Sequence, residues 1–187
     1  MTATTYVALL KGINVGKAKR IAMADLRALL AGLGYDDVAT LLQSGNAVFT
    51  ASATAPKVTA AIEKGLLDEC GLDVAVVVRT EAQLAAAVAA DPFTDLADDP
   101  SKHLLGFLSG VPEASKLTAF DDLVTSKNVD PDVGGVYRIE KDHCYLWCPQ
   151  GVSKSSFAMV DWDRKLGVTV TMRNFATIGK LLDMTKV

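Results

Sequence analysis

Val76-Val77-Val78-Arg79-Thr80 and Val170-Thr171-Met172-Arg173-Asn174 are two versions of one pattern. In each, a valine-containing segment typical of a strand ends in arginine, and a residue that favours helix N-caps follows. Leu84 and Ile178 then lie at matching positions in the helix that each pattern predicts. One short match is modest support for an internal repeat, so the order of the other elements has to be compared as well.

That order is also the same in both halves. Strands are predicted over residues 5–10, 38–42, 47–51 and 73–79, and again over 103–109, 136–140, 143–148 and 168–172. With the helical segments between them, each half has the order β-α-β-β-α-β followed by one more helix. This is the ferredoxin-like, split β-α-β unit, an antiparallel sheet with helices on one face. We therefore predict a duplicated α+β fold.

Local signals place the boundaries of these elements. Residues 91–100 are polar, acidic and bounded by prolines, so they predict a linker between subdomains over 1–98 and 99–187. Thr80 with Gln83 predicts a capping box, and Asn174 predicts the cap of the last helix. Ser153 predicts the start of a helix that runs to about Leu166.

Composition excludes several classes of protein. The 187 residues are 50% hydrophobic and carry a formal net charge of −3 with a pI near 5.3. Nucleic-acid binding across the whole surface is excluded, because that role normally needs a basic protein. Three cysteines do not fit a secreted disulfide framework, and neither a signal peptide nor an apolar run of bilayer length is present. We expect a cytoplasmic protein without membrane contact, and the sequence leaves its oligomeric state open.

The strongest candidate for chemistry is the basic loop that follows the first strand. Residues 11–20 contain four cations, two glycines and one asparagine without an acidic residue: Lys11, Gly12, Asn14, Gly16, Lys17, Lys19 and Arg20. Glycine N–H groups, nearby cations and a following helix N-terminus together predict an anion site. The alternative is a solvated connection whose glycines only satisfy backbone geometry. The spacing of Gly12 and Gly16 excludes a phosphate-binding P-loop, and Ala18 lacks the hydroxyl that would hold magnesium.

Two further places have polar residues that could complete such a site. Ser44-Gly45-Asn46 predicts a hairpin turn in the same sheet, and this turn could present Ser44 and Asn46 beside the loop. Arg173 and Asn174 stand at a strand end and a helix start, where capping is the simpler interpretation. No histidine, cysteine or carboxylate spacing fits a metal centre, so no metal or cofactor is predicted.

Several of these motifs resemble one bacterial family. Leu9-Leu10-Lys11-Gly12-Ile13-Asn14-Val15-Gly16, Met23-Ala24-Asp25-Leu26-Arg27 and Gln43-Ser44-Gly45-Asn46 resemble the family called domain of unknown function 1697. Pro149-Gln150-Gly151 with Ser155, and Thr171-Met172-Arg173-Asn174-Phe175-Ala176-Thr177, resemble its C-terminal motifs. The resemblance implies a two-part, ferredoxin-like α+β fold. It implies no activity, substrate or catalytic residue.

Three functions remain open at this point. The first is binding of an anionic ligand, such as a nucleotide, a phosphorylated metabolite or an RNA segment, at the basic loop. The second is an enzyme of unassigned class that uses the same pocket, with Asp25 as the nearest acid in the sequence. The third is a protein–protein adaptor that uses exposed sheet edges.

Overall fold

The computed structural model describes residues 3–15, 19–126 and 134–186. The chain forms two four-stranded antiparallel sheets. It divides into two compact units, one comprising Met1–Ala86 with Lys180–Val187 and the other Ala87–Gly179. The predicted division into residues 1–98 and 99–187 stays a prediction.

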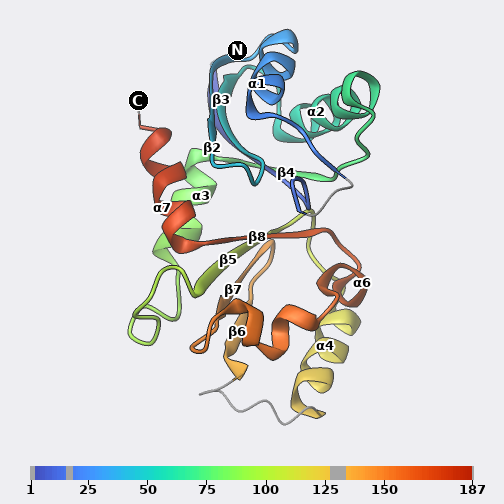
Figure 1. Ribbon diagram of the computed structural model, residues 1–187. Helices are drawn as coiled ribbons and strands as arrows, with labels where there is room; N and C mark the ends of the chain where they lie inside the picture. Colours follow the sequence, from blue (N-terminus) through green and yellow to red (C-terminus); the bar gives the residue numbers. More distant parts are fainter. Residues whose placement is uncertain (1–2, 16–18, 127–133, 187) are drawn as a thin grey trace. The chain divides into compact units, whose positions relative to one another are not determined.

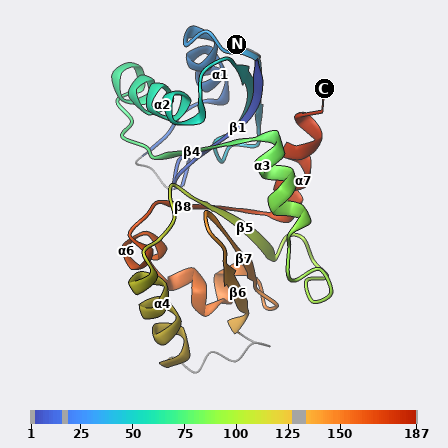
Figure 2. The ribbon, with the colours of Figure 1, turned by 180° about the vertical axis from the view of Figure 1, so that it is seen from behind.

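The first unit is built on the sheet β2-β3-β1-β4. Its strands are β1 (Thr4–Leu10), β2 (Asp36–Leu41), β3 (Asn46–Ala51) and β4 (Val76–Thr80). Helices α1 (Met23–Gly32) and α2 (Ala55–Cys70) cover one face of this sheet, as Figures 1 and 2 show from opposite sides. Helix α3 (Glu81–Ala89) follows β4 directly.

Alternation along the strands sets the core of the first unit. Tyr6, Ala8 and Leu10 of β1 point to the helix-covered face, because successive side chains of a strand point to opposite faces. Leu26 of α1 and Ile62 of α2 are fully buried in the same cluster. Burying each of these large side chains contributes about 1.5–3 kcal/mol, so the two helices are fixed over the sheet.

The second unit repeats this arrangement with the sheet β6-β7-β5-β8. Its strands are β5 (His103–Leu108), β6 (Val136–Ile139), β7 (His143–Trp147) and β8 (Val170–Asn174). Helix α4 (Ala114–Ser126) and the short helix α6 (Trp162–Leu166) supply Phe120 and Trp162 to its core. Helix α7 (Phe175–Met184) follows β8, as α3 follows β4.

The predicted α+β fold with two antiparallel sheets is confirmed, and so are the predicted caps at Thr80 and Asn174. In both sheets the first strand of the unit pairs with the third and the fourth, which is the order of a split β-α-β unit. Thr80 and Gln83 form the capping box, with hydrogen bonds of 2.9 Å and 3.2 Å between side chains and backbone N–H groups. Asn174 Oδ1 accepts a 2.9 Å hydrogen bond from the N–H of Thr177.

The predicted helix from Ser153 to about Leu166 is wrong. Two 3₁₀ turns, η1 (Val152–Lys154) and η2 (Ser156–Met159), come before α6 instead. Ser155 interrupts the segment, because its hydroxyl donates to the carbonyl of Gly134 and accepts from the N–H of Phe157. Asp161 then caps α6 by accepting from the N–H of Arg164. These local bonds compete with a continuous helix.

Candidate functional site

The loop after β1 leaves the sheet from a tightly held strand end. Leu10 donates its N–H to the carbonyl of Gly45 at 2.8 Å, and Lys11 donates its N–H to the carbonyl of Ala75 at 2.9 Å. Gly12 turns the chain with a φ of +65°, a conformation that glycine adopts at little cost. Ile13 then returns to the core with 1% of its surface exposed. The loop is therefore anchored on both neighbouring strands and in the core.

Asn14 closes this loop with its side chain. Its Nδ2 group donates to the carbonyls of Ile21 at 3.0 Å and Gln43 at 2.7 Å, and its Oδ1 accepts from the N–H of Ile21 at 3.1 Å. The Asn14 N–H also donates to the carbonyl of Lys19 at 2.6 Å. Its backbone has a φ of +55°, a region in which asparagine is several-fold enriched. Asn14 thus ties both ends of the loop to each other and to the β2–β3 hairpin.

The hairpin fits against the loop through Gly45. A Cβ atom on Gly45 would lie 2.7 Å from Ile13 Cδ1 and 2.7 Å from Leu10 Cβ, and the residue has a φ of +75°. Asn46 is fully buried and donates to the carbonyl of Leu41 and to the hydroxyl of Ser44. Ser44 is exposed. Asn46 therefore shapes the turn, and the loop and the hairpin form one interlocked structure.

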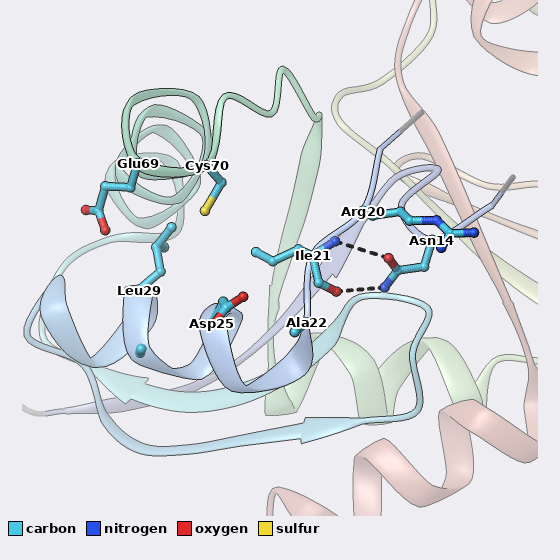
Figure 3. A pocket seen from close by; sticks show the side chains of 9 residues that line it. Asn14, Arg20, Ile21, Ala22, Asp25, Leu29, Glu69 and Cys70 are labelled. Atoms are coloured by element: carbon cyan, nitrogen blue, oxygen red, sulfur yellow. Dashed lines mark hydrogen bonds between the residues drawn. The ribbon is translucent and has the colours of Figure 1, made fainter. Parts of the chain in front are cut away.

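A cavity with a volume of about 680 Å³ opens between this loop, α1 and the end of α2. Figure 3 shows Glu69 and Cys70 on α2 facing α1, with Asn14 and Arg20 at the opposite end of the view. The residues that line it are Asn14, Arg20, Ile21, Ala22, Asp25, Ala28, Leu29, Glu69 and Cys70. The cavity thus brings Asn14 and Arg20 together with Asp25, whereas Ser44 is not among its lining residues.

Charges of both signs line the cavity. Arg20 supplies a cation beside the loop, Asp25 supplies a carboxylate in the first turn of α1, and Glu69 supplies one near the end of α2. Burial raises the pKa of the Cys70 thiol, and the carboxylates of Glu69 and Asp25 raise it further. Helix α2 also ends here, at the left-handed cap Gly71, and a helix C-terminus carries partial negative charge. A ligand in this cavity would meet the cation of Arg20 and the hydrogen-bond acceptors of Asp25 and Glu69.

The basic residues of the loop have different surroundings. Lys11 is half-buried, whereas Lys19 and Arg20 are exposed. The Lys19 ammonium donates to the carbonyl of Asp73. The predicted site residues Gly16 and Lys17 lie outside the described residues.

Arg173 and Asn174 belong to the second unit. Arg173 Nη1 donates to the carbonyl of Met172 at 2.8 Å, and burial lowers the pKa of its guanidinium to about 10. Arg79 makes the equivalent bond to the carbonyl of Val78 in the first unit, at 2.9 Å. The side chain of Asn174 caps α7. The repeat noticed in the sequence therefore extends to individual hydrogen bonds.

The described part of the chain also bears on metals, thiols and membranes. Over residues 3–15, 19–126 and 134–186, no group of three His, Cys, Asp or Glu residues is arranged to hold a metal ion. Cys70, Cys144 and Cys148 are free thiols. None of the helices described is both long and apolar enough to span a membrane.

Comparison with known proteins identifies the family. The family described as "Protein of unknown function (DUF1697)" matches residues 3–135, which include the interlocked loop and hairpin. The chain belongs to the DUF1697 family. No curated protein matches this DUF1697 chain. A solved structure, that of the conserved bacterial protein SP0830 from Streptococcus pneumoniae, is similar over 98% of this chain and 99% of that chain, with a TM-score of 0.69 and 20% identity. That likeness supports the fold of the DUF1697 chain.

Two residues of the cavity were not predicted as site residues. Glu69 and Cys70 lie in the last turn of α2, far from the loop in sequence. No local motif marks them, because they reach the cavity only through the packing of α2 beside α1 on the sheet. The sequence marks only where α2 ends, through Gly71, because glycine favours the left-handed conformation of a helix C-cap.

Proposed function

We propose that this DUF1697 protein binds a small anionic ligand, a nucleotide or phosphorylated metabolite, at the loop over residues 11–20. Lys11, Lys19 and Arg20 would supply positive charge to the anionic group. The observation that carries the proposal is that the hydrogen bonds of Asn14 tie the described ends of this cation-rich loop together beside the cavity. A site held in place before binding loses less conformational entropy when its ligand binds.

Comparison of the two repeats supports a role beyond connecting the strand and the helix. In the first unit residues 11–22 join β1 to α1, whereas in the second unit residues 109–113 join β5 to α4. The connection between the first strand and the first helix of the second unit is thus less than half as long as that of the first unit. The first connection is longer than the topology requires, and long loops that carry their own hydrogen bonds are often functional.

The start of α1 adds to the positive end of the site. Ala22 occupies the N-cap position, and alanine has no side-chain acceptor for the N–H groups of the first turn. These N–H groups and the helix dipole favour negative charge at this end, and Asp25 in the first turn already supplies one carboxylate. Arg20 lies two residues before Ala22 and lines the same cavity. We place the anionic group of the ligand here.

The two carboxylates of the cavity favour a nucleotide over inorganic phosphate. Asp25 and Glu69 can accept hydrogen bonds from the hydroxyl or amino groups of a sugar or base, which phosphate alone lacks. A volume of about 680 Å³ is within the range of sites for small organic ligands.

The test compares matched double variants of the full chain. AMP, GMP, CMP, UMP and inorganic phosphate are screened by thermal shift, and the Kd of the best probe is then measured by calorimetry at several salt concentrations. Lys11→Gln with Arg20→Gln should weaken binding about tenfold or more and flatten its salt dependence. Lys57→Gln with Lys64→Gln removes the same charge from exposed positions of α2 and should leave binding unchanged.

Two results would contradict the proposal. One is that no probe raises the melting temperature, since a ligand that binds the native state must stabilise it. The other is equal weakening by the two double variants, which would indicate non-specific attraction. A short single-stranded RNA that binds where all mononucleotides fail would assign the loop to RNA instead.

The position of Asp25 favours one second candidate, an enzyme that uses the same pocket. Asp25 lines the cavity together with Asn14 and Arg20, within the same unit. If a bound nucleotide is converted, Asp25→Asn should stop the conversion while leaving measurable binding. Conversion at the original rate in this variant would exclude Asp25 as the base.

Sheet edges and thiols support two weaker expectations. Edge strand β2 has a register shift between Asp36 and Ala39, and such irregular, charged edges discourage pairing with another chain. The adaptor function therefore stays a prediction without support at this edge. We place the protein in the cytoplasm because its three cysteines are free thiols.

A further inference from the structure

A second cavity, with a volume of about 340 Å³, lies on the other face of the first sheet. Thr5 of β1 pairs with Thr50 of β3, and Val48 of β3 pairs with Ala39 of β2, so their side chains share the face opposite α1 and α2. Met184 and Thr185, at the end of α7, complete the lining. Figures 1 and 2 both show the end of α7 beside this sheet.

A bulge in the edge strand brings a carboxylate to this cavity. The pairing of β2 with β3 shifts between Asp36 and Ala39, and Asp37 has a φ of +53°. Such bulges redirect a side chain from the regular alternation of the strand. Asp37 lines the cavity, and its Oδ2 accepts a 3.2 Å hydrogen bond from the hydroxyl of Thr50.

Two of the hydroxyl groups that line the cavity, those of Thr50 and Thr185, act as acceptors toward a ligand. A threonine hydroxyl has one hydrogen, and Thr50 gives its hydrogen to Asp37. Thr185 gives its hydrogen to the carbonyl of Leu182, at 2.8 Å. Both oxygens therefore offer lone pairs, and Asp37 offers a carboxylate. A ligand that uses these three acceptors must bring the hydrogen-bond donors.

The charges around the cavity also favour a ligand with a positive charge. The described residues that line this cavity include Asp37 but no lysine, arginine or histidine. Helix α7 ends at Met184, and the partial negative charge of a helix C-terminus favours a cation there. Val48, Ala39 and Met184 provide apolar surface next to these acceptors.

From this arrangement we infer that the second cavity binds a small amine, with its ammonium group on Asp37 and the two hydroxyl oxygens, and a short alkyl chain on Val48 and Met184. An ammonium group brings three N–H donors and one positive charge, which match three acceptors of the cavity. This site is separate from the loop over residues 11–20, and it does not depend on the function proposed there.

The experiment titrates the full chain with three compounds of equal carbon number: n-butylamine, butan-1-ol and butyrate. Backbone amide shifts of residues 37 and 50 follow occupancy of the cavity at neutral pH and low salt. Butylamine should shift both signals saturably, and butanol and butyrate should bind at least about tenfold more weakly because they lack the cation.

Two matched variants test the role of the carboxylate. Asp37→Asn removes the charge and keeps a side chain that tolerates positive φ, so it should weaken butylamine binding about tenfold or more. Asp36→Asn removes the same charge from the neighbouring exposed position outside the cavity and should leave binding unchanged. Thr50→Val should also weaken binding, because it deletes one acceptor.

Three results would overturn the inference. Butanol that binds as tightly as butylamine would show that the alkyl chain alone is recognised. Equal weakening by Asp36→Asn and Asp37→Asn would show non-specific attraction of cations. Shifts that do not saturate for any of the three compounds would show that the cavity binds no small amine.

Discussion

Replacing Asn14 tests whether its side chain holds the loop. Asn14→Ala removes three side-chain hydrogen bonds, two to Ile21 and one to Gln43. Each such bond contributes about 0.5–1.5 kcal/mol net, and the one to Gln43 is exposed and belongs at the low end. Alanine at a φ of +55° adds about 1 kcal/mol of backbone cost. We expect a loss of about 3–4 kcal/mol in the free energy of unfolding.

Asn14→Gly separates the two contributions. Glycine loses the same hydrogen bonds but adopts positive φ without strain, so its loss should be about 1 kcal/mol smaller than that of alanine. Urea denaturation gives the free energies, and hydrogen exchange of the Ile21 N–H reports on the loop itself, because that N–H donates to Asn14 Oδ1. Equal losses in the two variants would refute the backbone argument. Losses below about 1 kcal/mol in both would refute the idea that Asn14 holds the loop.

The remaining predictions concern close packing, thiol reactivity and pH. Gly45→Ala should lower the free energy of unfolding by about 3 kcal/mol or more, because its Cβ would lie 2.7 Å from its nearest neighbours at a φ of +75°. Gly12→Ala has a φ of +65° and no atom within 4 Å, so it should lower that free energy by only about 1 kcal/mol. Equal shifts of the urea midpoint in the two variants would contradict this. Burial raises the pKa of Cys144 to about 12, so a thiol reagent at pH 8 should modify this thiol only after denaturation. Rapid modification of the native protein would show that the thiol is accessible. Burial lowers the pKa of His103 below its ordinary 6.5, despite the opposing effect of Asp91. The unfolded state therefore binds more protons than the folded state, so the stability should fall as the pH decreases below about 6.5. His103→Gln should flatten that slope in denaturation curves, and an unchanged slope would contradict the assignment.

The fold was predicted from sequence patterns that extend over only a few residues. Alternating apolar residues and the caps at Thr80 and Asn174 act over a few residues, so they can be recognised without knowing the tertiary structure. The repeated arginine followed by a cap then gave the duplication, and the two sheets have the same order. The prediction from sequence was wrong where a side chain bonds to a residue that is distant in the sequence. Ser155 bonds to Gly134, and this contact breaks the segment that the sequence favours as one helix.

The candidate site was predictable only in part, for the same reason. The basic loop was visible as a run of cations, but the bond from Asn14 to Gln43 joins residues that are remote in sequence. Asn14 was predicted as a ligand group, and the structure shows that its amide also holds the loop closed. Asp25 was noted only as the nearest acid. Glu69 could not be assigned to the same cavity, since its position depends on how α2 packs.

The duplication provides an internal control that separates residues needed for the fold from residues available for function. Arg79 and Arg173 make the same bond to the preceding carbonyl in both repeats, so we attribute them to the architecture of the strand ends. The loop over residues 11–22 has no counterpart of its length in the second repeat, although both repeats form the same sheet. We therefore expect its cations Lys11 and Arg20 to contribute more to binding than to folding. Substituting Arg79 or Arg173 should lower stability, whereas Lys11→Gln with Arg20→Gln should lower ligand affinity and leave the free energy of unfolding within about 0.5 kcal/mol of the original. A large loss of stability in that double variant would mean that the loop cations serve the fold, and the functional argument from its length would then fail.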